Sequence, residues 1–439
     1  MGLGLTFISG FLGGLAALLM PCIFPMLPLT VGFFTKRKKG IRDALLYGLS
    51  IVLIYVGLGM AITIIFGASA LNNLATNGVF NLCFFLLLVL FAASFFGAFE
   101  LTLPNKWIST AEDKTVKQGF GGILMMAAVL ALVSFSCTGP IIGTLLVQTA
   151  SSGQRLGPAI GMLGFSIALA LPFVLFALFP SWLQALPKSG GWMETIKISL
   201  GFLELGLSLK FLSNVDLAYH WQWFDREVFL VLWIMITACF CLFLLGKLTI
   251  QVPKLFAGII VGAFCLYMIP GLWGAPLKSI AAFLPPQDTQ DFDLYSPKTN
   301  VSKVKYADLF HAPLGLQAFF DYEEGMAYAR SVHKPVMIDF TGHACVNCRK
   351  MEAAIWPDPK VLPLIRDEYV LIQLYVDDKT NGIGERNSKL QAEKFNSNSQ
   401  PQYVLLDNQG KLLAQPVGAV YDATAYAAYL QGGLNQFKK

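Results

Sequence analysis

The sequence predicts a polytopic α-helical membrane domain of about eight spans, followed by a smaller α/β domain. Of the 439 residues, 55% are hydrophobic and only 13% are charged, whereas soluble domains carry roughly 25% charged residues. Apolar runs of about 20 residues, long enough to cross a bilayer, recur over residues 1–275. From about residue 285 the composition becomes that of a globular protein, in which strand-like and helix-like segments alternate.

The apolar runs define the membrane domain. The first run has no basic segment before it and no small-residue cleavage site after it, so we interpret it as a span rather than a signal peptide. The sequence begins almost inside this span, which leaves room for an amino-terminal part ahead of it. The predicted domains are a transmembrane domain (1–275), a linker (276–310) and an exported domain (311–439). The expected spans are 5–34, 43–67, 79–100, 119–148, 156–180, 194–213, 228–246 and 255–274.

Loop charges predict the orientation of these spans. The first, third, fifth and seventh connections hold most of the Lys and Arg residues, whereas the fourth and sixth hold only Arg155 and Arg226 and the second holds none. Lys and Arg favour the cytoplasmic side of a membrane. We therefore expect the odd-numbered connections to be cytoplasmic, and the amino terminus and the carboxy-terminal domain both to lie on the outer side of the membrane. The net charge of +5 comes from basic residues beside the spans, which argues against a nucleic-acid partner.

Two cysteines in apolar runs are each followed by proline three residues later. Cys22 precedes Pro25, and Cys137 precedes Pro140. Each cysteine lies in the first helix of a block of three spans. Because three is odd, the second block enters the membrane from the side opposite to the first, as in inverted-topology repeats.

The prolines predict an irregular helix beside each of these cysteines. Proline removes a backbone donor and breaks or kinks a helix. Irregular backbone at membrane depth is tolerated only where protein or water covers it. We therefore expect Cys22 and Cys137 to face the interior of the bundle and to meet near its pseudo-two-fold axis. The alternative is two buried cysteines beside ordinary kinks, which the repetition of one pattern at equivalent places disfavours.

One acidic residue is predicted inside a span. Glu204 lies in the middle of the run 194–213, where a carboxylate is costly and is a functional candidate. It either relays protons for thiol chemistry or pairs with Lys197 or Lys210 on its own helix, and the sequence leaves both open. The other cysteines in apolar runs are not followed by proline three residues later, and we interpret them as small packing residues: Cys83, Cys239, Cys241 and Cys265.

The exported domain carries a Cys-x-x-Cys motif. A strand at 335–340 runs into Cys345-Val-Asn-Cys348, which should open a helix. A strand followed by this motif is the thioredoxin-like redox arrangement. The segments predicted around it are a helix at 316–332, a strand at 369–375, a hairpin centred on 408–410 and a helix at 423–437.

The helix start predicts different roles for the two cysteines. The positive end of the helix dipole lowers the pKa of a thiol there and favours its thiolate. Cys345 should be the exposed nucleophile, and Cys348, one turn inward, the buried resolving thiol. The alternative, half of a zinc site, lacks a second ligand pair in the domain, so we expect no metal. His343 either tunes Cys345 or is an ordinary surface histidine.

These motifs together resemble the DsbD-type thiol:disulfide interchange reductases over nearly all of the chain. Residues 1–275 alone resemble the CcdA-like membrane domain. The resemblance implies that Cys22 and Cys137 form a membrane redox pair, which takes electrons from cytoplasmic thioredoxin. It implies that this pair reduces Cys345 and Cys348 of a periplasmic thioredoxin-like domain.

The resemblance also assigns supporting residues in the exported domain. Asp339 matches a buried acid before the Cys-x-x-Cys motif, and Glu352 matches a second nearby acid; both would raise thiol pKa values and move protons. Pro401 matches the cis-proline that faces the disulfide. The chain departs from the family in having Ala344 where tryptophan is usual. The family usually has an amino-terminal immunoglobulin-like domain that passes electrons onward; we do not expect it within the 439 residues, so the final acceptor stays open.

The function predicted is a transmembrane protein-disulfide reductase. Its expected acceptors are periplasmic disulfide proteins, such as disulfide isomerases and the apocytochromes c of cytochrome c maturation. No cofactor is expected, because every step runs through cysteine pairs. The rival is a solute transporter with a redox-sensing thioredoxin-like domain, since inverted repeats, broken helices and Glu204 fit both. An oxidase running electrons inward is a weaker rival, because no Gly-rich nucleotide fingerprint is present.

Overall fold

A computed structural model describes residues 3–18, 42, 45–57, 59–60, 77–98, 123–125, 127–128, 131, 157–178, 191–246, 252–292, 294 and 304–438. These residues form two compact units. The first comprises Met1–Ala75 and Leu86–Leu205, and the second comprises Thr76–Phe85 and Gly206–Lys439. Each unit is described by itself below.

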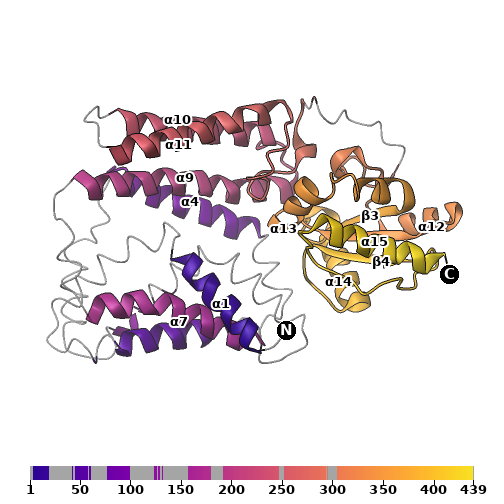
Figure 1. Ribbon diagram of the computed structural model, residues 1–439, viewed down its shortest axis with the longest axis horizontal. Coiled ribbons are helices and arrows are strands. Elements are labelled where there is room, and N and C mark those ends of the chain that lie inside the picture. Colours follow the sequence, from indigo (N-terminus) through magenta and orange to yellow (C-terminus); the bar gives the residue numbers. More distant parts are fainter. Residues whose placement is uncertain are drawn as a thin grey trace. The chain divides into compact units, whose positions relative to one another are not determined.

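Two helices of the first unit pack closely through glycines. They are α1 (Leu3–Ala17) and α7 (Gly157–Leu178) (Figure 1). A Cβ on Gly14 would lie 2.5 Å from the carbonyl oxygen of Phe165, and one on Gly164 would lie 2.5 Å from that of Phe7. Larger residues at these positions would push the helices apart. Small residues at helix interfaces are typical of membrane bundles, where backbones approach closely.

Three segments among the described residues are long and apolar enough to cross a membrane. They are Gly78–Phe95, which is α4, Arg226–Leu245, which is α10, and Pro253–Trp273, which contains most of α11 (Val252–Met268). Shorter apolar helices occupy Thr6–Ala17, Leu45–Gly57 and Ala159–Pro172. These segments agree with a polytopic membrane domain, while the predicted number of eight spans stays a prediction.

Helix α9 (Gly191–Tyr219) covers the predicted span 194–213 and continues beyond it. It is less apolar than the three segments above, because charged residues recur along it: Glu194, Lys197, Glu204, Lys210 and Asp216. Its last part belongs to the second unit, where the indole Nε1 of Trp233 in α10 donates to the carbonyl oxygen of Gly206 at 2.8 Å. This bond joins α9 to α10 within that unit.

The loop after α11 folds back onto α9 and α10. It begins with a short 3-10 turn, η1 (Ile269–Trp273). Arg226 at the start of α10 is buried, and its Nη1 donates to the carbonyl oxygen of Pro285 at 2.7 Å. The apolar cluster under the loop contains Leu209, Phe224, Phe229, Leu230, Trp233, Met268, Leu277, Ile280 and Leu284.

The carboxy-terminal part is an α/β domain around one mixed sheet. The strands are β1 (Ala318–Phe319), β2 (Val336–Thr341), β3 (Val370–Tyr375) and β4 (Gln402–Leu406), in the order β1-β3-β2-β4. β3 runs parallel to β1 and β2, while β4 is antiparallel to β2. Every residue of β2, β3 and β4 is buried, as expected for a sheet covered on both faces.

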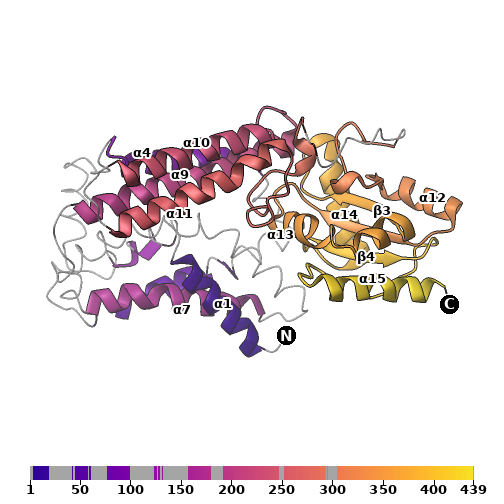
Figure 2. The ribbon, with the colours of Figure 1, turned by 45° about the horizontal axis from the view of Figure 1, so that its top comes forward.

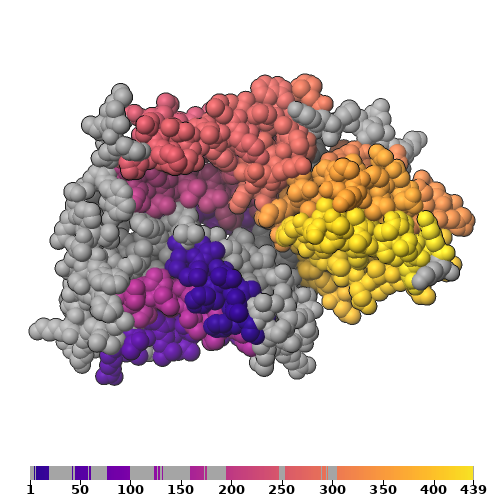
Figure 3. Space-filling view, viewed as in Figure 1, coloured from indigo at the N-terminus to yellow at the C-terminus, as the bar shows by residue number. Residues whose placement is uncertain are grey.

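Helices cover both faces of this sheet. One apolar cluster joins a face to α12 (Tyr322–Val332) and α14 (Ile383–Phe395). The other joins the opposite face to α15 (Ala423–Phe437), which runs beside β4 and lies at the surface (Figures 2 and 3). Short helical turns complete the domain: α13 (Val346–Lys350), η3 (Pro313–Gly315), η4 (Met351–Ile355), η5 (Leu364–Glu368) and η6 (Thr380–Gly382). The turn η2 (Gln287–Thr289) lies earlier, in the loop after α11, where the Gln287 side-chain amide donates to the Gly274 carbonyl oxygen at 2.7 Å.

Two predicted elements of this domain differ from the structure. The helix expected at 316–332 begins only at Tyr322, because Asp321 caps it by accepting the Glu324 amide at 3.2 Å, and the residues before it form β1 instead. The hairpin turn forms, with the Asp407 amide donating to the Lys411 carbonyl oxygen at 2.9 Å. However, the segment after the turn is not a strand, and it pairs with β4 through isolated bridges, Leu412 with Leu406 and Val417 with Tyr403.

Candidate redox site

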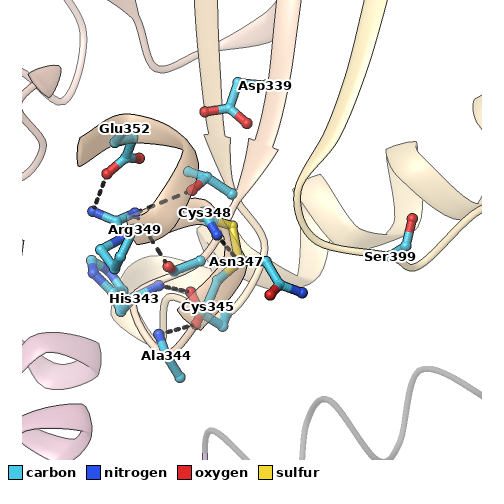
Figure 4. Close-up of a disulfide and its surroundings, with 12 residues drawn as sticks. Asp339, His343, Ala344, Cys345, Asn347, Cys348, Arg349, Glu352 and Ser399 are labelled. Carbon is cyan, nitrogen blue, oxygen red and sulfur yellow. Dashed lines mark hydrogen bonds and ion pairs between the residues drawn. A yellow bond between two sulfur atoms is a disulfide. The ribbon is translucent and has the colours of Figure 1, made fainter. Parts of the chain in front are cut away.

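The cysteine pair of the exported domain forms a disulfide at the start of a helix. Cys345 and Cys348 are bonded, with their Cα atoms 5.3 Å apart (Figure 4). Cys345 is the N-cap residue of α13, and its sulfur accepts the Cys348 amide at 3.1 Å. Cys345 is half-buried, whereas Cys348 is 1% exposed. An attacking thiolate can therefore reach Cys345 but not Cys348, which fits the predicted roles of nucleophile and resolving thiol.

A carboxylate anchors the loop between β2 and this disulfide. Asp377 follows β3, and its two carboxylate oxygens accept the amides of His343 at 2.9 Å and of Ala344 at 3.0 Å. Asp377 is buried. The two bonds hold the backbone that leads into Cys345, so the attacked sulfur starts from one defined position.

The next residue, Asp378, binds two histidines. The same carboxylate oxygen lies 3.0 Å from Nε2 of His343 and 2.6 Å from Nε2 of His220. Burial favours a raised pKa for Asp378, but the hydrogen bonds from both imidazoles outweigh it and hold the pKa below its usual value. His343 is 5% exposed, so the interpretation as a surface histidine is wrong.

Asp339 and Glu352 occupy different surroundings near the disulfide. Asp339, in β2, is buried, and this burial raises its pKa to about 6 against the opposing effects of a hydrogen bond from Gln373 and the charge of Arg349. Glu352 instead forms an ion pair with Arg349 at 2.8 Å. Arg349 also donates to the Thr341 hydroxyl oxygen at 3.2 Å, which connects the pair to the end of β2.

Pro401 precedes β4, and the Gln400–Pro401 peptide bond is cis. The side chain of Gln400 lies beside the loop that leads into Cys345. A Cβ built on Gly342 would lie 2.5 Å from Oε1 of Gln400 and 2.7 Å from Oδ2 of Asp377. Glycine at this position therefore allows both side chains to approach the loop backbone.

The predicted membrane pair and its prolines lie outside the described residues: Cys22, Pro25, Cys137 and Pro140. Glu204 is described and is 1% exposed. Neither of its carboxylate oxygens has a hydrogen-bond partner among the described residues, and no ion pair there joins it to Lys197 or Lys210. Its pairing with a lysine of α9 is therefore not observed, and its role as a proton relay stays a prediction.

Sequence reasoning missed Asp377, Asp378 and His220. A signal for the two aspartates was present, because adjacent acids directly after a buried strand lie at the carboxyl edge of a parallel sheet, where sites form. His220 carried no such signal. It is 158 residues from Asp378 in sequence, and only the fold brings the two together.

Comparison with known families agrees with this geometry. Residues 4–215 match the family described as the cytochrome C biogenesis protein transmembrane domain, and residues 322–433 match a thioredoxin-like domain. The chain has the DsbD-type combination of domains. The predicted resemblance to DsbD-type proteins and the predicted fold class are thus confirmed, whereas the domain boundaries and the site residues stay predictions.

Relatives match along nearly the whole chain. A thiol:disulfide interchange protein DsbD from Pseudoalteromonas atlantica is 27% identical over 436 residues, covering 95% of this chain and 66% of that protein. One from Haemophilus influenzae is 25% identical over 446 residues, covering 97% and 69%. The chain therefore spans about two thirds of the length of these relatives. A solved structure of a DsbH oxidoreductase, 22% identical, covers 32% of this chain and 95% of its own, with a TM-score of 0.25.

These findings define the class of chemistry. A membrane domain of this family is joined to a thioredoxin-like domain with a disulfide at the start of a helix. The predicted class, thiol–disulfide interchange by a multi-pass bacterial membrane protein that acts on thiol–disulfide partner proteins, is confirmed.

Proposed function

We propose that this chain carries two electrons across the bacterial inner membrane, from cytoplasmic thioredoxin to periplasmic disulfide proteins. Cys22 and Cys137 form the membrane relay, and Cys345 and Cys348 form the exported one. The acceptors are oxidised disulfide isomerases and apocytochromes c. The Cys345–Cys348 disulfide carries this proposal, because it lies at a helix start in a domain fused to a membrane domain of the cytochrome c biogenesis type.

Each transfer is a thiol–disulfide exchange. A thiolate of the reduced Cys22/Cys137 pair attacks Cys345, forms a mixed disulfide and expels Cys348 as a thiolate, which takes up a proton. The second membrane thiol loses its proton, attacks the mixed disulfide and releases Cys345 as a thiolate. The membrane pair is oxidised by two electrons and the exported pair is reduced by two. No prosthetic group takes part, because the electrons travel with the sulfur bonds.

The orientation follows from the loop charges. The basic connections lie in the cytoplasm, which puts the amino terminus and the exported domain in the periplasm. In this arrangement the electrons cross from one compartment to the other through Cys22 and Cys137. Glu204 supplies a buried carboxyl group in α9 for the protons that the exchanges release and consume.

Thiol trapping in cells tests the relay. Cys137→Ser should leave Cys345–Cys348 oxidised, and removal of cytoplasmic thioredoxin should do the same in the unchanged protein. Cys239→Ser is the matched control, since Cys239 is a free cysteine in α10. Reduced Cys345 and Cys348 in the Cys137→Ser strain would disprove the relay.

The rival function is solute transport with a redox-sensing domain. The buried Glu204, which has no hydrogen-bond partner among the described residues, is the observation that favours it. The double variant Cys22→Ala/Cys137→Ala separates the two functions. A relay loses all electron transfer in this variant, whereas a transporter keeps its solute flux.

A further inference from the structure

We propose that the carboxyl-terminal end of α9 is the docking site of the exported domain, and that His220 and Asp378 form its latch. This inference rests on the proposed relay, which needs the exported cysteines to return to the membrane domain. Two polar contacts join the segments. Nε2 of His220 lies 2.6 Å from the carboxylate of Asp378, and the Lys379 amide donates to the carbonyl oxygen of Ala218 at 3.2 Å.

The burial of Asp378 makes docking depend on the hydrogen-bond donors that its carboxylate finds. Its side chain has no solvent exposure, and a buried carboxylate is costly unless donors satisfy it. His343 supplies one donor from within the exported domain, and His220 supplies another from the end of α9. When the exported domain leaves α9, this carboxylate loses one of these partners, which favours its return.

An apolar surface surrounds the latch. The His220 ring meets Phe310 edge-on, with ring centroids 5.6 Å apart, and Phe310 stacks on Tyr375 at 4.5 Å. Phe310 is 2% exposed, and Tyr375 is the last residue of β3. The imidazole of His220 therefore packs against the core of the exported domain, in addition to its polar contact with Asp378.

The latch is connected directly to the redox loop. His343, which shares the Asp378 oxygen, is two residues before Cys345, and its own amide is held by Asp377. Docking at His220 therefore positions the loop that bears the attacked sulfur. His220 and Asp378 act through this loop, so both are positioning residues.

Exposed aromatic side chains flank His220 along the chain. Tyr219, Trp221 and Trp223 are 42%, 47% and 81% exposed. Trp and Tyr concentrate at membrane–water interfaces, where one end of the side chain is apolar and the other is hydrated. The docking site therefore lies at the surface of the bilayer, where a tethered domain can reach it without entering the membrane.

A metal ion shared by His220, His343 and Asp378 fits the geometry less well. Their ligand atoms lie within 4.8 Å of one another, close enough to suggest a site. However, ligands of one tetrahedral zinc ion, each at about 2.0–2.1 Å, are separated from each other by roughly 3.3 Å. The 2.6 Å between His220 and Asp378 is shorter and matches a charge-assisted hydrogen bond.

Docking raises the effective concentration of Cys345 near the membrane domain. A tether alone converts the encounter into an intramolecular one, and a weak latch increases the time spent in the productive position. A latch of one charge-assisted bond and one backbone bond also releases readily, which suits a domain that must then reach separate acceptor proteins.

The test uses the full chain in lipid nanodiscs and a matched pair of variants. His220→Asn removes the long imidazole but keeps a residue type that tolerates the left-handed backbone at this position (φ 50°). His333→Asn is the control, because His333 has the same φ of 50° and is exposed at the end of α12. Asp378→Asn is the second variant, which removes the charge and keeps the size.

Hydrogen exchange of the Lys379 amide in the oxidised protein reports docking without any electron transfer. We expect His220→Asn to accelerate this exchange about tenfold or more, the effect of losing one hydrogen bond to a charged group, and His333→Asn to leave it unchanged. Unchanged exchange in His220→Asn would overturn the latch. A cobalt(II) absorption band that requires both His220 and His343 would overturn it too, in favour of a metal site.

The rate at which the membrane domain reduces Cys345–Cys348 tests the role of docking. It should fall about tenfold in His220→Asn and Asp378→Asn, because the docked fraction falls with the loss of the charged bond. A normal rate with accelerated exchange would overturn this role. If the unchanged protein does not reduce Cys345–Cys348 at all, the relay fails, while the exchange result still decides whether the latch exists.

Discussion

The Gln373 side-chain amide donates to Asp339 at 3.0 Å, and the two residues are direct partners on the neighbouring strands β3 and β2. Both are buried. The other carboxylate oxygen of Asp339 has no hydrogen-bond partner among the described residues. One neutral donor does not compensate for the desolvation of a carboxylate, so Asp339 keeps its proton to a higher pH than an exposed aspartate does.

This relationship predicts how the stability of the exported domain depends on pH. The pKa of Asp339 is raised by burial from 3.8 to about 6. Between these two values the unfolded chain releases a proton that the folded domain retains, so the free energy of unfolding falls as the pH rises. Above pH 6 the loss is complete and amounts to about 3 kcal/mol at 1.36 kcal/mol per unit of pKa.

Infrared spectroscopy and denaturation together measure this effect. The band of a protonated carboxyl group should disappear with a midpoint near pH 6 and should be absent in Asp339→Asn. The difference in unfolding free energy between pH 4 and pH 7 should shrink by about 2 kcal/mol in the variant, because the unfolded chain has already lost part of this proton at pH 4. Asp407→Asn, outside the core, is the control. An unchanged pH dependence in Asp339→Asn would contradict the prediction.

A second prediction concerns Asp377 and the redox loop. Asp377→Ala removes the acceptor for the His343 and Ala344 amides, so the exported domain should lose about 3 kcal/mol of unfolding free energy, roughly 1.5 for each bond to a charged group. Both amides should also exchange hydrogen faster. Asp407→Ala is a matched control. Asp407 also accepts two amides, those of Gln409 and Lys411, but in an exposed turn where water can bind these amides once the carboxylate is removed. Equal losses in the two variants would show that burial of the anchor does not matter.

The parts of the site that sequence predicts are the local ones. Cys345 follows a β-rich run and precedes a helix, and this order along a few residues is enough to predict a thiol at a helix start. The same holds for the buried position of Cys348, which follows from helical periodicity. Neither prediction needs a contact between distant segments.

The parts that sequence does not predict depend on long-range packing. Asp377 reaches the loop from the end of β3, 34 residues away, and His220 reaches Asp378 across 158 residues. Strand β1 contains two residues and forms because β3 pairs with it. Local propensity alone favours placing these residues in the helix that follows. Tertiary pairing overrides local preference in such short elements.

A third prediction concerns the ion pair beside the disulfide. The side chains of Arg349 and Glu352 are 5% and 8% exposed. Breaking a buried pair leaves an uncompensated charge, so Arg349→Met and Glu352→Met should each cost about 3–5 kcal/mol of unfolding free energy. The double variant should cost much less than the sum, because no charge is then left behind. Chemical denaturation of the oxidised protein measures all three, and additive losses would show that the two charges do not interact.

The last prediction compares two adjacent glycines of α15. Gly433 faces the sheet, where a Cβ would lie 2.6 Å from both the Tyr369 hydroxyl and a Leu405 methyl group, while Gly432 has open space. Tyr369 cannot yield freely, because its hydroxyl donates to the Leu430 carbonyl oxygen at 2.7 Å. Gly433→Ala should therefore destabilise the exported domain by about 1–3 kcal/mol. Gly432→Ala should stabilise it by about 0.5–1 kcal/mol, because alanine restricts the unfolded chain and favours helix. Thermal denaturation of the oxidised protein compares them, and a shift of the same sign in both variants would contradict the packing of α15 against β4.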